Sequence, residues 1–223
     1  MNRTIVFFAA MLFTVSVFGQ EEGKEKKPFP FEEFSLSVNR TNMSSSGNEN
    51  RFGGGVGMYH PFVLGKQFDL MLGIEYNYTS LFVDHISQGM HYYGNNMTLH
   101  IHTFSVPLAL RFSMGQNVKY FLESGVFFGA LSAGNSGDSY VINPLPTPED
   151  PWDKKPAKLD GERGFSYGFS FGTGVKIPMK RIEWVVKADY KIDLKTLKTA
   201  GYLHHQYYRL GVGIRKNASY KKP

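Results

Sequence analysis

Two kinds of side chain alternate without a break along residues 164–177. The large, mostly apolar set is Phe165, Tyr167, Phe169, Phe171, Thr173, Val175 and Ile177, and the small or polar set is Gly164, Ser166, Gly168, Ser170, Gly172, Gly174 and Lys176. Because successive side chains of a β-strand point to opposite faces, this pattern predicts one long strand with an apolar face and a small, polar face. Ordinary strands have about 5–6 residues. A strand of this length favours a wall between lipid and a crowded barrel interior.

The same alternation occurs in seven further stretches. The predicted strands cover residues 34–41, 52–62, 68–82, 99–112, 119–131, 164–176, 183–194 and 206–216. An even number of strands is what a bacterial outer-membrane barrel requires. The sequence therefore predicts an all-β fold, an eight-stranded antiparallel up-and-down transmembrane β-barrel over residues 34–216.

The connections between these strands alternate in length. They are short at residues 64–66, 113–117 and 178–181, and long at residues 42–51, 83–98, 132–163 and 195–205. Outer-membrane barrels have short periplasmic turns and longer external loops. We therefore expect a protein of the bacterial outer membrane with both chain ends in the periplasm.

The first residues have the pattern of a secretory signal peptide. Arg3 precedes an uncharged run, and Val17 and Gly19 have the spacing of a signal-peptidase site. We expect residues 1–19 to be removed, with residues 20–33 and 217–223 forming periplasmic tails. A retained anchor helix is the alternative, but the run is short for a helix that spans a bilayer.

The composition excludes several classes of site. The chain has no cysteine, so disulfides, thiolate metal sites and a cysteine nucleophile are excluded. The net charge of +6 comes from basic clusters at the chain ends and in one long loop. We expect these clusters to be solvated or to contact anionic lipid headgroups, and we expect no nucleic acid partner. Outer-membrane lipid is the expected surrounding of a monomeric barrel without a cofactor.

A secreted lipocalin-like barrel, which binds a ligand in an apolar cavity, is the soluble alternative. It also has eight strands, and alternation alone does not distinguish inside from outside. Strand length, the contrast between short and long connections, and a face made largely of glycine favour the membrane barrel.

If the apolar faces contact lipid, the opposite faces line a narrow lumen. Its charged residues are then Glu75, Arg111, Glu123, Lys187, Asp189, Lys191 and Arg209. Both signs of charge must pair in a space only wide enough for side chains, because an unpaired buried ion costs several kcal/mol. We predict a lumen plugged by salt bridges, with a selective pore as the alternative.

Two short motifs suggest other chemistry. His100 and His102 share a strand face at a spacing that can hold a metal ion, but two histidines are too few for a specific site. Residues 85–87 have the His-x-Ser spacing of outer-membrane lipid A deacylases. The acidic member of such a triad would have to be Asp84, and adjacent residues rarely align in that way. We predict no metal site and no catalytic residue, and keep a lipid hydrolase as an alternative.

The longest predicted loop, residues 132–163, is rich in proline around a tryptophan. Pro144, Pro146 and Trp152 lie at its centre. Prolines stiffen an extended chain, and an exposed tryptophan is a typical binding anchor. A loop of about 30 residues without a strand pattern is either functional or disordered. The leading hypothesis is a non-enzymatic barrel that binds a protein partner or ligand through its external loops.

Three of the predicted strands resemble a known family. Residues 104–112 read Phe-Ser-Val-Pro-Leu-Ala-Leu-Arg-Phe, which is similar to a strand of PorT-like outer-membrane barrels, and the proline at 107 should mark a bulge. Residues 120–129 and 171–175 resemble the glycine-marked strands that follow it. The resemblance implies an eight-stranded outer-membrane barrel. For the founding member it implies a part in a protein secretion system. A secretion-system component, in which the periplasmic tail of residues 20–30 docks the machinery, is therefore the second hypothesis for this chain.

Overall fold

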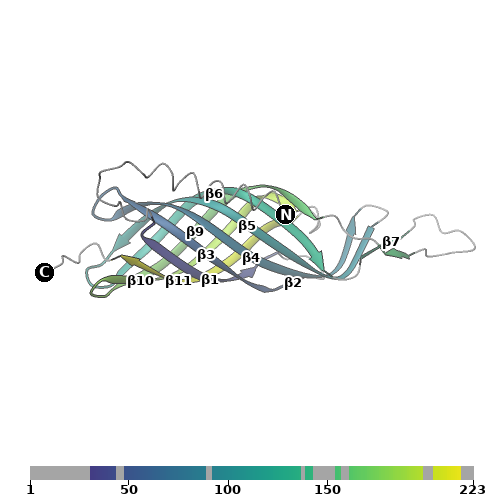
Figure 1. Ribbon diagram of the computed structural model, residues 1–223, viewed down its shortest axis with the longest axis horizontal. Helices are drawn as coiled ribbons and strands as arrows, with labels where there is room; N and C mark the ends of the chain where they lie inside the picture. Colours follow the sequence, from purple (N-terminus) through teal and green to yellow (C-terminus); the bar gives the residue numbers. More distant parts are fainter. Residues whose placement is uncertain are drawn as a thin grey trace, which may run out of the picture. The chain divides into compact units, whose positions relative to one another are not determined.

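The computed structural model consists of β-strands that wrap into one continuous sheet (Figure 1). The structure describes residues 31–43, 48–88, 92–136, 139–142, 154–156, 161–197 and 203–216. The strands are β1 (Glu33–Thr41), β2 (Asn48–Asn50), β3 (Phe52–Val63), β4 (Phe68–Gln88), β5 (Tyr92–Met114), β6 (Lys119–Ser136), β7 (Ser139–Ile142), β8 (Lys154–Pro156), β9 (Glu162–Pro178), β10 (Ile182–Leu197) and β11 (Leu203–Lys216). Within these ranges no helix is long and apolar enough to cross a membrane.

Eight of the strands close a ring. Hydrogen-bonded neighbours follow the order β4, β3, β1, β11, β10, β9, β6 and β5, and β5 pairs with β4 to complete the circle. Every pairing in the ring is antiparallel. The fold is therefore the predicted up-and-down barrel. Because the ring is closed, its strands satisfy one another's backbone groups, as a strand structure in lipid requires.

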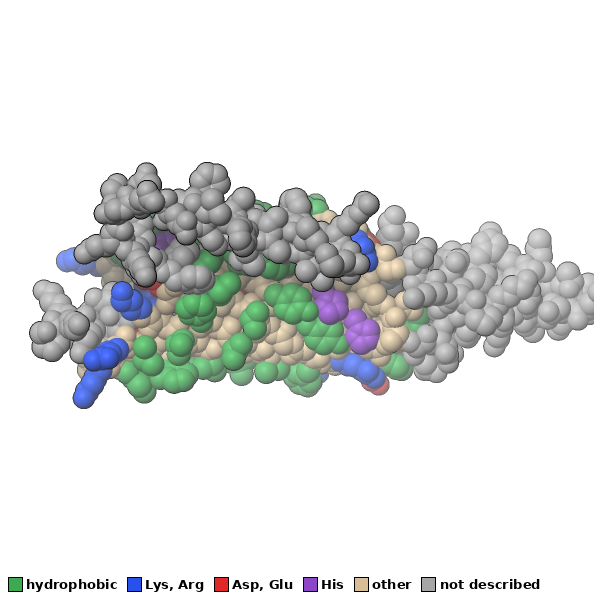
Figure 2. Space-filling model, in the orientation of Figure 1, with side chains coloured by type: hydrophobic (Ala, Val, Ile, Leu, Met, Phe, Trp, Pro, Cys, Tyr) green, Lys and Arg blue, Asp and Glu red, His purple; other side chains and the backbone are tan. Residues whose placement is uncertain are grey.

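The side chains of β9 separate as the alternation predicts. Phe165, Tyr167, Phe169 and Phe171 are between 43% and 60% exposed, whereas Ser166 on the opposite face is fully buried. Hydrophobic side chains are prominent on the outer wall in Figure 2. The lipocalin alternative is wrong, because a lipocalin surrounds an apolar cavity with a polar exterior and this barrel carries its ion pairs inside.

The three short connections lie where they were predicted, at residues 64–67, 115–118 and 179–181. Gly115, in the second connection, has a φ of 110°. This is a left-handed backbone conformation that residues other than glycine rarely adopt. The barrel begins one residue earlier than predicted, because Glu33 already pairs with Arg215 of β11 and Tyr59 of β3.

All four predicted long loops contain residues that lie in strands, and two of them differ most from the prediction. Strands β4 and β5 continue through most of residues 83–98, with pairs from Val83↔Met97 to Gln88↔Tyr92. Residues 132–163 begin and end in strands, and they include the paired strands β7 and β8, of which β7 also pairs with β5. The alternation test missed the extension of β4 and β5 because it needs a contrast between faces, and residues 84–96 carry polar side chains on both faces.

Pro107 does not mark a bulge. On one side β5 keeps a continuous register with β6 through Pro107↔Phe127. On the other, the register with β4 is the same at Leu72↔Leu108 and at Glu75↔Ser105. A proline lacks the N–H group but its φ is compatible with an extended strand, so the pairing is interrupted without a shift.

Candidate functional site

The barrel interior contains a group of ion pairs around Glu75. The carboxylate of Glu75 accepts a hydrogen bond from Lys191 and another, 2.6 Å long, from the hydroxyl of Tyr59. Nη2 of Arg209 lies 2.9 Å from Glu75 Oε1, close enough for an ion pair although the N–H is not aligned as a hydrogen bond. Arg209 Nε donates to Asp189 at 2.9 Å. These charged side chains come from β4, β10 and β11, so the group joins strands that are not all neighbours.

A second group surrounds Arg111. Its guanidinium donates two hydrogen bonds to Glu33, at 2.7 and 2.9 Å, and a third from Nε to Glu123 at 2.7 Å. Lys187 donates to the other oxygen of Glu123 at 2.8 Å. The Arg111 Cζ atom also lies 4.5 Å from the centroid of the Phe121 ring. The guanidinium is therefore fully buried among two carboxylates and an aromatic ring.

The structure brings all seven predicted lumen residues into these two groups. Glu75, Asp189, Lys191 and Arg209 form the first, and Arg111, Glu123 and Lys187 belong to the second. Glu33 was missed, because it lies just before the predicted start of its strand. With Glu33 included, these two groups contain four carboxylates and four cations, so their charges balance. Continuing the alternation by one step, from Ser37 and Ser35 back to residue 33, would have found it.

A smaller ion-pair group lies at the turn side of the barrel. Asp69 accepts hydrogen bonds from Lys176 at 3.4 Å and from Arg215 at 3.1 Å. These residues line a polar cavity of about 220 Å³ together with Glu183 and Lys119. The alternation places Asp69 and Lys176 on inward faces, but the predicted set of lumen charges did not include them.

The loop-side end of the interior is apolar. A cluster of buried side chains fills it: Met43, Leu81, Val83, Met97, Leu99, Ile101, Leu131, Ala133 and Leu197. Leu81, Met97 and Ile101 are fully buried. The sequence analysis missed this layer because several of its members lie in stretches that were predicted to be loops. An ion that crossed the lumen would have to pass both the paired charges and this apolar layer.

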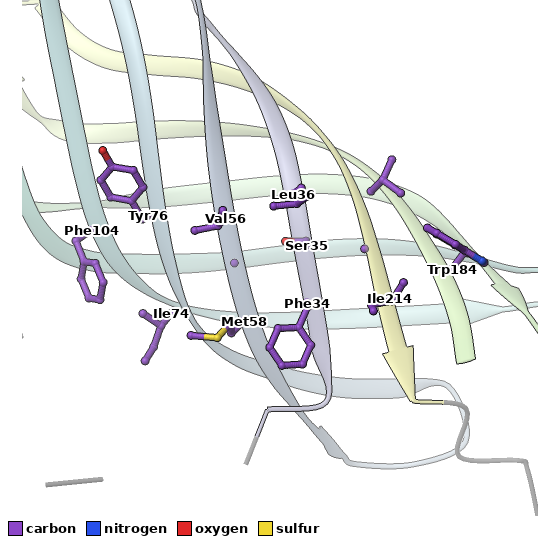
Figure 3. A pocket seen from close by; sticks show the side chains of 13 residues that line it. Phe34, Ser35, Leu36, Val56, Met58, Ile74, Tyr76, Phe104, Trp184 and Ile214 are labelled. Atoms are coloured by element: carbon purple, nitrogen blue, oxygen red, sulfur yellow. The ribbon is translucent and has the colours of Figure 1, made fainter. Parts of the chain in front are cut away.

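An apolar groove of about 530 Å³ lies on the outer wall (Figure 3). Its side chains include Phe34, Leu36, Val56, Met58 and Trp184, which come from β1, β3 and β10. They belong to the outward set of each strand, so the groove faces away from the lumen. At this position a barrel contacts acyl chains, which accounts for an apolar lining without a specific ligand.

His100 and His102 lie on the outer face of β5, each beside a tyrosine of β4. His100 Nδ1 is 2.8 Å from the hydroxyl of Tyr78, and His102 Nδ1 is 2.7 Å from that of Tyr76. Within the described residues, no three His, Asp or Glu side chains are placed to hold a metal ion. His205, predicted to lie in a loop, is buried in β11 with Nε2 at 2.8 Å from Thr79 Oγ1.

Several predicted functional residues are outside the described part of the chain. Pro144, Pro146 and Trp152 are among them, as are the predicted signal peptide and most of the two tails. His85 and Ser87 lie in β4, opposite Asn95 and Tyr93 of β5, in a stretch whose backbone alone is described. The partner-binding and lipid-hydrolase hypotheses therefore rest on the sequence at these positions.

No protein-family model matches the sequence, and no curated protein matches it. Among solved structures, the chain is similar to Neisserial surface protein A, with 12% identity and a TM-score of 0.48 over 82% of this chain and 95% of that one. It is also similar to a major outer membrane protein from Thermus thermophilus, with 10% identity and a TM-score of 0.46 over 82% of this chain and 98% of that one. A third similar structure is the N-terminal β-barrel domain of Pseudomonas aeruginosa OprF, with 11% identity and a TM-score of 0.37 over 82% of this chain and 97% of that one. The fold assignment rests on the strand pairing, and the resemblance to PorT-like barrels stays a prediction.

Proposed function

We propose that this chain is a non-enzymatic barrel of the bacterial outer membrane, with a closed lumen and an external region that binds a partner. The height of its apolar wall supports the location. On β4 the outward side chains are apolar or aromatic from Phe68 to Tyr78. Ten residues of strand span about 33 Å, or about 25 Å along the membrane normal at a tilt of about 40°. That height matches the apolar band of an outer-membrane barrel, which is about 25 Å.

The single observation that carries the closed lumen is the balanced set of four buried carboxylates and four buried cations. An ion that crossed the barrel would have to displace these pairs and then pass the apolar layer around Leu81 and Ile101. Both steps are unfavourable, because a buried charge without its partner costs several kcal/mol.

Single-channel recording in a planar bilayer tests the closed lumen. We expect no stable open state for the full-length barrel, with insertion verified by heat-modifiable gel migration of the same preparation. A stable conductance of nanosiemens would contradict the proposal, because a lumen filled by ion pairs has no continuous water column.

The length of β4 and β5 supports an external binding region. They contain 21 and 23 residues, whereas about 9–11 suffice for a tilted strand to cross a bilayer. Beyond the apolar band they continue as a hairpin, and β7 adds to β5 at Tyr92–Gly94. The proline-rich segment of residues 143–153 connects β7 to β8, and its Trp152 supplies a binding anchor.

Affinity capture from intact outer membranes tests the partner. We expect a variant that lacks residues 143–153, and more sharply Trp152→Ala, to lose a partner that the wild type retains. A deletion of residues 199–201 in another external connection is the matched control. If all variants captured the partner equally well, the partner would bind a part of the chain other than residues 143–153. For the non-enzymatic part, lipid A from a Ser87→Ala strain should be unchanged, and a difference from the wild type would favour the hydrolase.

A further inference from the structure

Basic and imidazole groups gather on the outer wall of the barrel where the apolar band ends toward the loops. Figure 2 shows exposed histidine side chains beside the hydrophobic ones, followed toward the same end by basic side chains with a smaller acidic area beside them. Arg40 on β1, Arg51 before β3, and His100 and His102 on β5 form this group, which we call the rim patch. Arg40, Arg51 and His102 are exposed.

The side chains of the rim patch are held in place by aromatic and hydroxyl neighbours. The Arg51 Cζ atom lies 4.8 Å from the centroid of the Phe82 ring, and its Nη1 donates to Thr98 Oγ1 at 3.1 Å. Thr98 pairs with Phe82 across the β4–β5 ladder and lies two residues from His100 on the same face. Arg40 lies over the ring of Phe52 at 5.7 Å. The patch therefore forms a connected strip over neighbouring strands.

The imidazoles present donors in defined positions. A Tyr76 hydroxyl that donates to Nδ1 of His102 leaves the proton of the neutral ring on Nε2. Among the described residues, Nε2 of His102 has no protein partner. Nε2 of His100 is already engaged, at 2.8 Å from Ser136 Oγ. His102 can thus donate to a group outside the protein, while His100 and Tyr78 support its position.

The two guanidinium groups have no acidic partner in the described part of the chain, although the interior cations of the same barrel are all paired. Aromatic rings and one threonine hydroxyl satisfy only part of the donor capacity of an arginine. Arginine binds phosphate with two parallel hydrogen bonds, and such charge-assisted bonds are among the strongest in proteins. An anion outside the protein would complete the bonding of both groups.

The depth of the patch identifies the source of that anion. His102 is opposite Tyr78, which lies at the loop-side end of the apolar band that begins at Phe68 on β4. This is the level of the lipid headgroups in the outer leaflet, and exposed apolar side chains such as Tyr76 and Phe52 lie beside the cations. We infer that the rim patch binds the phosphate of an outer-leaflet glycolipid, with the acyl chains lying along the apolar wall below. This inference rests on the proposed outer-membrane location.

Binding of purified lipid A to the full-length barrel in detergent micelles, measured by native mass spectrometry, tests this site. We expect diphosphorylated lipid A to bind and dephosphorylated lipid A to bind at least about tenfold more weakly. The double variant Arg40→Gln/Arg51→Gln should lose about thirtyfold in affinity, because each of the two cations near a charged lipid surface contributes about five- to sixfold. His102→Phe, which keeps the ring and removes the donor, should lose about threefold.

Two variants control for general charge attraction. Arg163→Gln removes an exposed cation from the loop-side end of β9, and Lys180→Gln removes one from a turn at the opposite end. Both should stay within about twofold of the wild type. If Arg163→Gln loses as much as the double variant, or if both forms of lipid A bind equally, the site does not exist. If dextran sulfate binds through Arg40 and Arg51 and lipid A does not, the occupant is a soluble polyanion and the inference is overturned.

Heat-modifiable gel migration of each variant separates this test from that of the proposed function. A heat-modifiable barrel that shows no phosphate-dependent binding contradicts the rim patch alone. A wild-type chain that stays soluble without detergent and shows no heat-modifiable band contradicts the outer-membrane location itself. If the double variant does not fold, Arg51→Gln alone gives the same comparison.

Discussion

Arg111 of β5 and Glu33 of β1 are joined across the lumen by two parallel hydrogen bonds, Nη1 to Oε2 at 2.7 Å and Nη2 to Oε1 at 2.9 Å. These strands are not neighbours, since β3 and β4 separate them on the shorter way round the ring. A bidentate bond requires both planar groups to be aligned. The pair therefore ties separate walls of the barrel together at a set distance.

Replacing Arg111 with methionine should destabilise the barrel strongly. The substitution keeps most of the side-chain volume but leaves Glu33 buried without a partner, and breaking a buried pair on one side costs about 3–5 kcal/mol. Urea unfolding in lipid vesicles measures the loss. Adding Glu33→Gln to Arg111→Met should recover part of it, and Arg163→Met on the outer wall is the control. An Arg111→Met barrel as stable as the wild type would indicate a hydrated lumen.

The loss of stability caused by Glu75→Gln should differ from that caused by Asp69→Asn, both in size and in its dependence on salt. Glu75 is 1% exposed, and its loss leaves Lys191 without a carboxylate partner and Arg209 with Asp189 alone. We therefore expect a loss of stability of about 3–5 kcal/mol that salt does not restore. The Asp69 side chain is 13% exposed beside a polar cavity, and its loss should cost about 1 kcal/mol, decreasing in about 1 M salt. Unfolding at low and high salt compares the two. Equal losses for both variants would contradict the difference in burial.

Gly172→Ala should be destabilising and Gly54→Ala should not. A Cβ atom at residue 172 would lie 2.8 Å from Asp189 Cβ, and so would push Asp189 away from Arg209. At residue 54 the nearest atom, Ser37 O, is 3.6 Å away, which is an ordinary contact. We expect Gly172→Ala to lower the free energy of unfolding by about 1–3 kcal/mol. For the second we expect no loss, since alanine restricts the unfolded chain more than glycine does. Unfolding midpoints in the same lipid measure both, and the reverse order would contradict the close contact at residue 172.

Leu81→Ala tests the apolar layer at the loop-side end. Leu81 is fully buried among neighbours such as Val83 and Leu99, so the shortened side chain leaves a cavity that should cost about 2–5 kcal/mol. Leu210→Ala, at a site 60% exposed on the lipid face, leaves no cavity and should cost less. Urea unfolding of the two variants side by side gives the comparison. If Leu210→Ala is the more damaging, the loop-side interior is not a packed layer.

The alternation of side chains was sufficient to predict the strands and their faces, because the period of 2 follows from backbone geometry alone. It placed Phe165 and Ser166 on opposite sides of β9, as the structure has them. The same rule failed for residues 84–96, where both faces carry polar side chains and backbone pairing leaves no signature in the sequence.

Which charges pair with one another depended on the closure of the ring. Arg111 and Glu33 are 78 residues apart, and they meet because the registers of β1 with β3, β3 with β4 and β4 with β5 place them at the same level of the closed ring. Nothing local to either residue encodes that distance. The sequence by itself therefore determined the barrel, its apolar outer wall and seven of its inward charges. Only the tertiary structure decided the partner of each charge and the apolar layer around Leu81, because both arise from side chains that converge from strands distant in the chain.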